Sequence, residues 1–136
     1  MNKKIWNFSL IVISLAGIGL SLTLEYISNN PVCPIGFEGC DQVLLSPYSK
    51  IFGISWAILG ASWFTVLFIL TIFTFHNIRR SLSLILLGWS LISIPSVIIL
   101  VLIEIFLVGA ICIYCTISHI IGLSSILPAY KISKQS

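Results

Sequence analysis

Four cysteines are the residues of this sequence best suited to covalent chemistry, and they occur as two pairs. Cys112 and Cys115 form a CxxC motif, whereas six residues separate Cys33 from Cys40. Residues three apart on a helix have Cβ atoms roughly 5–6 Å apart, so Cys112 and Cys115 can form a disulfide with modest adjustment. If the motif begins a helix, the unpaired amides and the helix dipole favour a thiolate, which is the nucleophile of disulfide exchange. The spacing therefore predicts a redox-active pair.

Two other uses of the four cysteines remain open. The first is a pair of structural disulfides, Cys33–Cys40 and Cys112–Cys115, in a small scaffold or transporter-type membrane protein. A helical bundle, however, hardly needs a structural disulfide across one helical turn. The second is a four-sulfur zinc site, which usually combines two tight CxxC knuckles; the wider spacing of Cys33 and Cys40 disfavours it, and we expect no metal. A thiol count under graded reduction separates an easily reduced relay from inert bridges.

The composition predicts that the chain is embedded in a membrane. Its 136 residues are 58% hydrophobic and 8% charged, with a mean hydropathy of +1.13, whereas a soluble domain carries about 25% charged residues. Four stretches approach or exceed the roughly 20 apolar residues that cross a bilayer. We expect an all-α, membrane-embedded four-helix bundle that fills one domain, residues 1–136. The expected spans are 5–27, 51–75, 82–108 and 111–130.

The charges predict the orientation of these spans. Basic residues collect in cytoplasmic loops of membrane proteins, and six of the seven here flank the spans on one side. These six are Lys3, Lys4, Arg79, Arg80, Lys131 and Lys134. All four acidic residues and Lys50 fall on the other side. We therefore expect a multi-pass protein of the cell membrane with both termini cytoplasmic, in which the first apolar segment is a retained helix. The net charge of +3 then reflects topology and predicts no nucleic-acid binding.

The outer loop, 28–50, is the only long polar stretch. It contains several turn-forming prolines and glycines, and its apolar residues 43–45 favour a short surface helix over 41–45. The predicted topology places this loop and the start of the fourth span on the outer side, so all four cysteines meet there. Disulfides persist in that compartment. Pro95 should kink the third helix by removing one backbone hydrogen bond.

With these elements in place, the chain resembles the vitamin K epoxide reductase family, in particular its prokaryotic, quinone-linked members. The matching elements occur in the same order relative to the four helices and cover nearly the whole chain. They are the pair Cys33 and Cys40, the Cys40-Asp41 step, SPYSKIFGI at 46–54, LIEIF at 102–106 and GAICIYC at 109–115. The order of motifs disfavours DsbB, in which the CxxC begins helix two and the other pair follows.

The resemblance implies an electron relay. A DsbA-like, thioredoxin-fold protein outside the membrane would attack Cys33, and Cys40 would pass the electrons on through a transient disulfide with Cys112. Cys115 would then face a membrane quinone and act as nucleophile or electron donor. No thioredoxin-like domain is expected after the fourth helix, so the partner should be a separate protein. We expect the bundle to act as a monomer.

The resemblance also implies a quinone site near Cys115. In vertebrate members, an Asn three residues before the Phe-Gly step and a Tyr four residues after the second CxxC cysteine bind the two ketones. This chain has Ser49 and His119 at those positions, with Phe52 in the Phe-Gly step. Because both side chains differ from the vertebrate ones, menaquinone or ubiquinone is expected in place of vitamin K epoxide.

Several further side chains have alternative roles that the sequence leaves open. His119 lies on the same face as Cys115 and either serves the quinone or packs against a neighbouring helix. Glu104 either handles protons or reaches the membrane interface. Trp56, Trp63 and Trp89 can line the pocket or serve as interfacial and packing residues.

Overall fold

The computed structural model describes residues 3–29, 50–51, 53–77, 79–109 and 113–135, and nearly all of them are helical. The elements in order are α1 (Lys3–Asn29), β1 (Lys50–Ile51), β2 (Ile54–Ser55), α3 (Trp56–His76), α4 (Arg80–Leu91), α5 (Ser93–Leu102), the π-helix η2 (Ile103–Val108), α6 (Ile113–Ser124) and α7 (Ile126–Gln135). The structure confirms the expected all-α membrane bundle. The surface helix expected at 41–45 lies outside the described residues.

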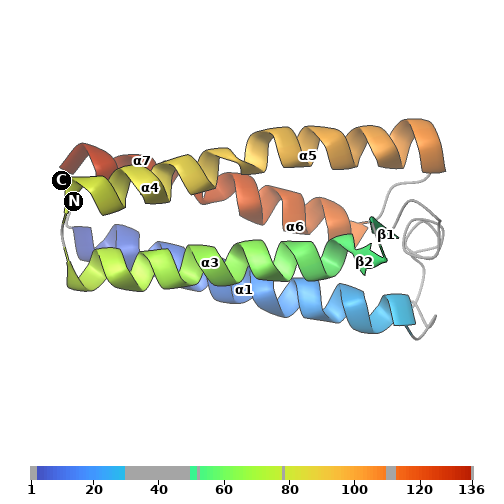
Figure 1. The fold of residues 1–136 in the computed structure, drawn as a ribbon, viewed down its shortest axis with the longest axis horizontal. Helices are drawn as coiled ribbons and strands as arrows, with labels where there is room; N and C mark the ends of the chain where they lie inside the picture. The colour runs from blue at the N-terminus through green and yellow to red at the C-terminus, as the bar shows by residue number, and fades with distance from the viewer. Residues whose placement is uncertain (1–2, 30–49, 52, 78, 110–112, 136) are drawn as a thin grey trace.

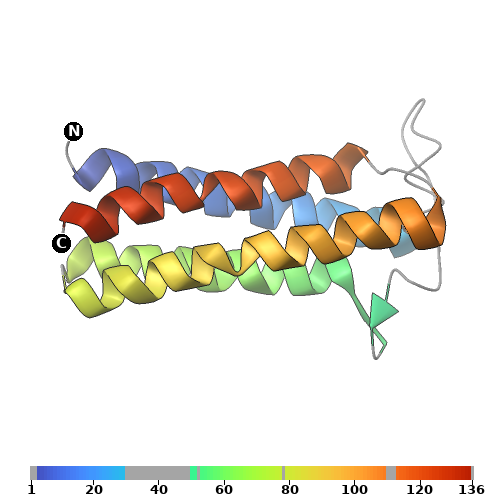
Figure 2. The ribbon, with the colours of Figure 1, turned by 90° about the horizontal axis from the view of Figure 1, so that it is seen from above.

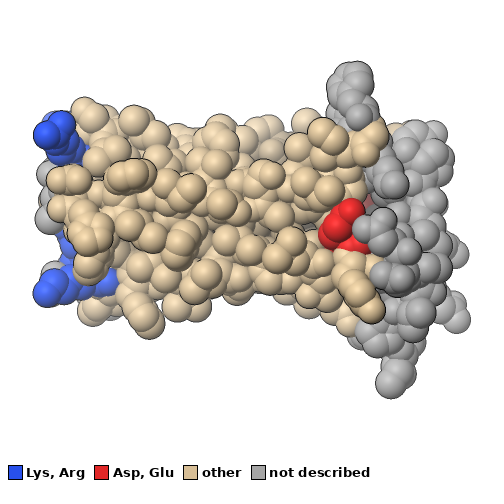
Figure 3. Space-filling view, turned by 60° about the horizontal axis from the view of Figure 1, so that its bottom comes forward, with Lys and Arg blue, Asp and Glu red and all other residues tan. Residues whose placement is uncertain are grey.

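Four helical stretches are long and apolar enough to cross a membrane. They are Lys3–Tyr26, Trp56–His76, Arg80–Leu107 and Ile113–Gln135. Figures 1 and 2 show them side by side along one axis, with both termini at the same end of the bundle. Lysine and arginine side chains gather at that end, and acidic side chains appear near the opposite one (Figure 3). We call these the basic end and the loop end; the loop end is where α1 finishes and α6 begins.

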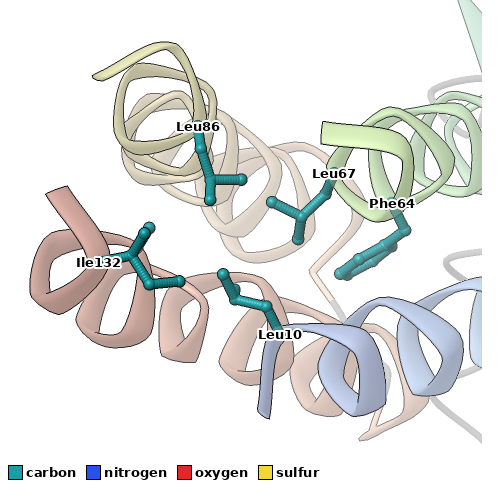
Figure 4. Packing of buried hydrophobic residues seen from close by; sticks show 6 residues of the cluster. Leu10, Phe64, Leu67, Leu86 and Ile132 are labelled. Carbon is teal, nitrogen blue, oxygen red and sulfur yellow. The ribbon is translucent and has the colours of Figure 1, made fainter. Parts of the chain in front are cut away.

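The buried core lies in the basic half of the bundle. Leu10 of α1, Leu67 of α3, Leu86 of α4 and Ile132 of α7 are fully buried and point toward one another (Figure 4). Lipid tails are as apolar as leucine, so membrane helices associate mainly through close packing rather than through the hydrophobic effect. This interlocked layer therefore joins all four spans at one level.

Two proline breaks divide the third and fourth spans at similar depths. Pro95 lacks the N–H that would bond four residues back, and α4 ends at Leu91 before α5 begins at Ser93. The one-residue break lies three residues before Pro95, in the helix where a kink was expected. Pro128 has the same effect on the last span, where α6 ends at Ser124 and α7 begins at Ile126. The basic-end segments α4 and α7 are 12 and 10 residues long, so the two breaks lie at matching levels.

A small hairpin precedes α3 at the loop end. Lys50 pairs with Ser55 and Ile51 with Ile54, around a turn in which Gly53 has a φ of 81°. That backbone conformation favours glycine. The expected span began at residue 51, but the helix begins only at Trp56, because the hairpin occupies the first positions and Ser55 caps the helix.

Ser55 ties the start of α3 to α1. Its hydroxyl donates a hydrogen bond to the carboxylate of Glu25 and accepts one from the backbone N–H of Ile58, with an N–O distance of 3.2 Å. The same oxygen thus satisfies one helix-end donor and links two helices.

We expect Ser55→Ala to lower the free energy of unfolding by about 1–2 kcal/mol, because it removes an N-cap and a charge-assisted hydrogen bond. Denaturation of the purified protein in detergent measures the effect. Ser62→Ala is the control, since the Ser62 hydroxyl is exposed and bonds only to the Ile58 carbonyl of its own helix. Equal stability of the two variants would contradict the link.

Candidate functional site

A cavity of about 270 Å³ opens between α3, α5 and α6 in the loop-end half of the bundle. Its walls are mostly apolar, with Leu59 and Phe64 on α3 facing Val97 and Leu100 on α5. Leu59 is 38% exposed on the lipid-facing surface, so the cavity is reachable from the side of the bundle. The lining fits a site for a small, largely apolar molecule.

The helix breaks explain why space remains at this level. On the basic-end side of the breaks, α4 packs closely on α7. On the loop-end side, α5 packs less extensively on α6. Figure 1 shows α5 and α3 on opposite sides of the loop-end half. On the α6 wall, Gly122 contributes no side chain to fill the gap.

Gly17 of α1 sets the position of the Phe64 wall. A Cβ built on Gly17 would overlap the Phe64 ring, which therefore lies directly against the backbone of α1. Phe64 is 3% exposed and is held edge-on by the neighbouring Trp63, with ring centroids 4.9 Å apart. Because Gly17 has no side chain, the Phe64 ring can pack against α1 and does not fill the cavity.

His119 supplies the α6 wall with a polar group. The side chain is half-buried, and its Nδ1 is buried without a hydrogen-bond partner among the described residues. A polar side chain inside a membrane span usually serves a purpose beyond packing. An unsatisfied nitrogen beside an apolar cavity is suited to hydrogen-bond an oxygen on a bound molecule.

Cys115 lies one helical turn from His119 on the same face of α6. It is half-buried and is the third residue of that helix, so it belongs to the first turn at the loop end, where the helix dipole is positive. Four residues on a helix correspond to about 6 Å along the axis. The structure therefore brings together Cys115 and His119, two of the residues singled out from the sequence. The other five, Cys33, Cys40, Ser49, Phe52 and Cys112, lie outside the described residues.

The three tryptophans have different positions. Trp56 and Trp63 line the cavity. Trp89 lies behind Trp63, with near-parallel rings whose centroids are 6.4 Å apart, and its indole N–H donates to the Trp63 carbonyl over 3.1 Å. Trp89 therefore supports the wall from outside.

Glu104 lies in the π-helix η2 at the loop end and is 5% exposed. Its carbonyl accepts the N–H of Gly109 over 2.9 Å, and Gly109 has a φ of 73°, a conformation suited to glycine. The buried position differs from a side chain that simply reaches the membrane interface.

Sequence reasoning missed Ser93 and Gly122, which face one another across the cavity wall. Ser93 is 5% exposed, and its hydroxyl has no partner among the described residues. The available signal was Pro95, because the break it causes places Ser93 at the start of a new helix. Hydropathy alone does not single out one serine of an apolar span.

The fold and the site define an integral membrane protein with a cysteine one helical turn from a residue that lines an apolar cavity. A search of curated proteins finds no match. The model of the vitamin K epoxide reductase family, by contrast, matches residues 8–129. The chain belongs to this family, and it is accordingly a multi-pass membrane oxidoreductase of the thiol–disulfide class. The matched range includes every cysteine and the cavity.

Proposed function

We propose that this protein oxidises a DsbA-like, thioredoxin-fold partner outside the cytoplasm and passes the electrons to a membrane quinone, menaquinone or ubiquinone. The observation that carries the proposal is the unsatisfied His119 nitrogen in an apolar cavity, one helical turn from Cys115. Disulfide formation in secreted proteins would be the outcome. The family match supports the reaction class, and the cavity supports the acceptor.

A quinone fits the cavity chemically. Its ring is flat and apolar and carries two ketone oxygens that only accept hydrogen bonds. Walls such as Phe64 and Leu100 offer the ring apolar contact, and His119 offers a donor for one ketone. The exposed rim at Leu59 gives a lipid-dissolved molecule a way in from the bilayer.

The four cysteines would carry two electrons in three exchanges. A partner thiolate attacks the Cys33–Cys40 disulfide at Cys33, and the partner leaves with a disulfide of its own. Cys40 then attacks Cys112, so the loop pair is re-oxidised while the Cys112–Cys115 disulfide is reduced. Finally Cys115 faces the acceptor, and two electrons and two protons leave the CxxC pair as its disulfide forms again. The quinone takes up both electrons and both protons as hydroquinone, so the overall reaction balances.

The proposed orientation places the basic end in the cytoplasm. The lysine and arginine side chains at that end support it through the general excess of basic residues in cytoplasmic loops. The loop end, where α6 begins near Cys115, then faces the compartment in which disulfides persist.

The proposal is tested by quinone reduction with the purified protein in lipid nanodiscs. A reduced DsbA-like protein is the donor, and menadione and ubiquinone-1 are the acceptors, followed by absorbance. We expect one hydroquinone for each partner disulfide formed, at a rate far above the protein-free reaction. Absence of enzyme-dependent reduction of either quinone would refute the proposed function.

We expect His119→Phe to raise the KM for menadione by about tenfold, since one hydrogen bond to the ligand is lost without loss of ring contact. The matched control is His76→Phe, because His76 is exposed at the basic end, where it contacts Phe75. Initial rates over a range of menadione concentrations measure both variants. If the two variants behaved alike, His119 would have no part in binding the acceptor.

A further inference from the structure

Ser93 occupies the deep end of the cavity. It begins α5 immediately after the proline-induced break and is 5% exposed. A Cβ built on Gly122 would lie 3.9 Å from the Ser93 Cβ and 4.0 Å from the Phe64 ring, so these residues meet across α5, α6 and α3. Ser93 therefore lies at the basic-end limit of the cavity, where α3, α5 and α6 come into contact.

The Ser93 hydroxyl is not bound to its own helix. Several other buried hydroxyls of the bundle donate to the carbonyl four residues earlier, as Ser14, Thr71 and Thr74 do over 2.7–2.8 Å. Four residues before Ser93, the Trp89 carbonyl accepts the N–H of Ile92 at 3.3 Å, and the Gly88 carbonyl accepts the same N–H at 3.3 Å. The buried Ser93 oxygen has no hydrogen-bond partner among the described residues. Its staggered rotamers let it turn toward a bound molecule.

The depths of the polar groups follow from their positions on α6. Gly122, which is level with Ser93, lies three residues beyond His119 and seven beyond Cys115. At a rise of 1.5 Å per residue these intervals are about 4.5 Å and about 10.5 Å. His119 thus lies between the reactive sulfur and Ser93. The two ketone oxygens of a para-quinone point in opposite directions from the ring. If the ring lies along the bundle axis, one oxygen is therefore at the level of His119 and the other at the level of Ser93.

We propose that Ser93, in place of the Ser49 implied by the family resemblance, is a ligand-positioning residue that donates a hydrogen bond to the quinone oxygen pointing away from the cysteines, while His119 holds the oxygen nearer Cys115. This inference rests on the proposed function and adds the orientation of the ring and its second anchor. With both oxygens held, the ring has one fixed pose, in which the carbonyl bound by His119 is the end nearer Cys115.

The kinetic test compares Ser93→Ala with Ser90→Ala. Ser90 is the matched control because it is fully buried one turn away with an equally unpartnered hydroxyl, but it does not line the cavity. We expect Ser93→Ala to raise the KM for menadione by about tenfold while kcat and the KM for the protein donor stay unchanged. Ser90→Ala should leave all three constants within about twofold of the parent.

Infrared difference spectroscopy provides a readout independent of turnover. Menadione labelled with ¹³C at one or the other carbonyl is bound to the Cys115→Ala protein, which cannot reduce it. Both carbonyl bands should lie below their frequency in apolar solvent, because hydrogen bonding weakens the C=O bond. Adding Ser93→Ala should return one of the two bands toward the solvent frequency, and adding His119→Phe the other.

The two proposals can fail separately. If the parent protein reduces no quinone, the proposed function fails and this inference with it. If the parent reduces menadione but Ser93→Ala matches Ser90→Ala in KM and leaves both carbonyl bands in place, only the role of Ser93 is overturned. A return of the same band in the Ser93 and His119 variants would also overturn the two-anchor pose.

Discussion

Replacing Cys115 with alanine will lower quinone reduction by about three orders of magnitude or more, with a protein dithiol or a small one as donor. The reason is that Cys115 lies one helical turn from the cavity-lining His119, on the same face of α6. No other cysteine is proposed to deliver electrons to the acceptor. Anaerobic assays with menadione, followed by absorbance, measure the loss.

Cys33→Ala provides the comparison. It removes the cysteine proposed to meet the protein donor, so turnover with a DsbA-like protein should fall as strongly. A small dithiol that reaches the Cys112–Cys115 disulfide directly should still support quinone reduction. Retention of more than a few per cent of activity in the Cys115→Ala protein would contradict its assigned role.

Gly17→Ala should lower the free energy of unfolding by about 1–3 kcal/mol and also weaken quinone binding. The new methyl group would overlap the Phe64 ring, so either the ring must move or α1 must separate from α3. Movement of the ring toward α5 would fill part of the cavity. Unfolding in detergent and the KM for menadione measure the two consequences.

Gly19→Ala is the matched control, because a Cβ at Gly19 meets no atom within 4 Å and the residue is exposed. It makes the same chemical change on the same helix without the clash. Identical stability and KM for the two alanine variants would show that Phe64 does not depend on Gly17 for its position.

The general architecture could be predicted because its cause is compositional. Long apolar runs must form helices in a bilayer, where every backbone group needs an internal partner. Pro95 likewise predicts a break, because its missing N–H removes a hydrogen bond of the helix in which it lies. Pro128 carries the same signal, but no break was predicted in the last span, where α6 ends at Ser124 and α7 begins at Ile126.

The walls of the cavity could not be predicted in the same way. In a span that is apolar all round, periodicity does not distinguish a face toward lipid from a face toward protein. The contact of Gly17 with Phe64 joins two spans that are far apart in sequence, and the proximity of Ser93 to Gly122 depends on where two breaks fall. The roles of all seven site residues remain predictions from the sequence and its family resemblance, and for Cys33, Cys40, Cys112, Ser49 and Phe52 the position does as well.

The breaks at Ile92 and Ser125 divide the third and fourth spans into a basic-end segment and a loop-end segment. Helices α1 and α3 run through both halves as uninterrupted rods, whereas the other two spans are each jointed at mid-depth. We therefore expect α5 and α6 to bend outward about these breaks around ligands of different size, while the buried layer of Leu10, Leu67, Leu86 and Ile132 keeps its packing. Within the third and fourth spans, α5 and α6 would then adapt to the ligand, while α4 and α7 would stay fixed in the core.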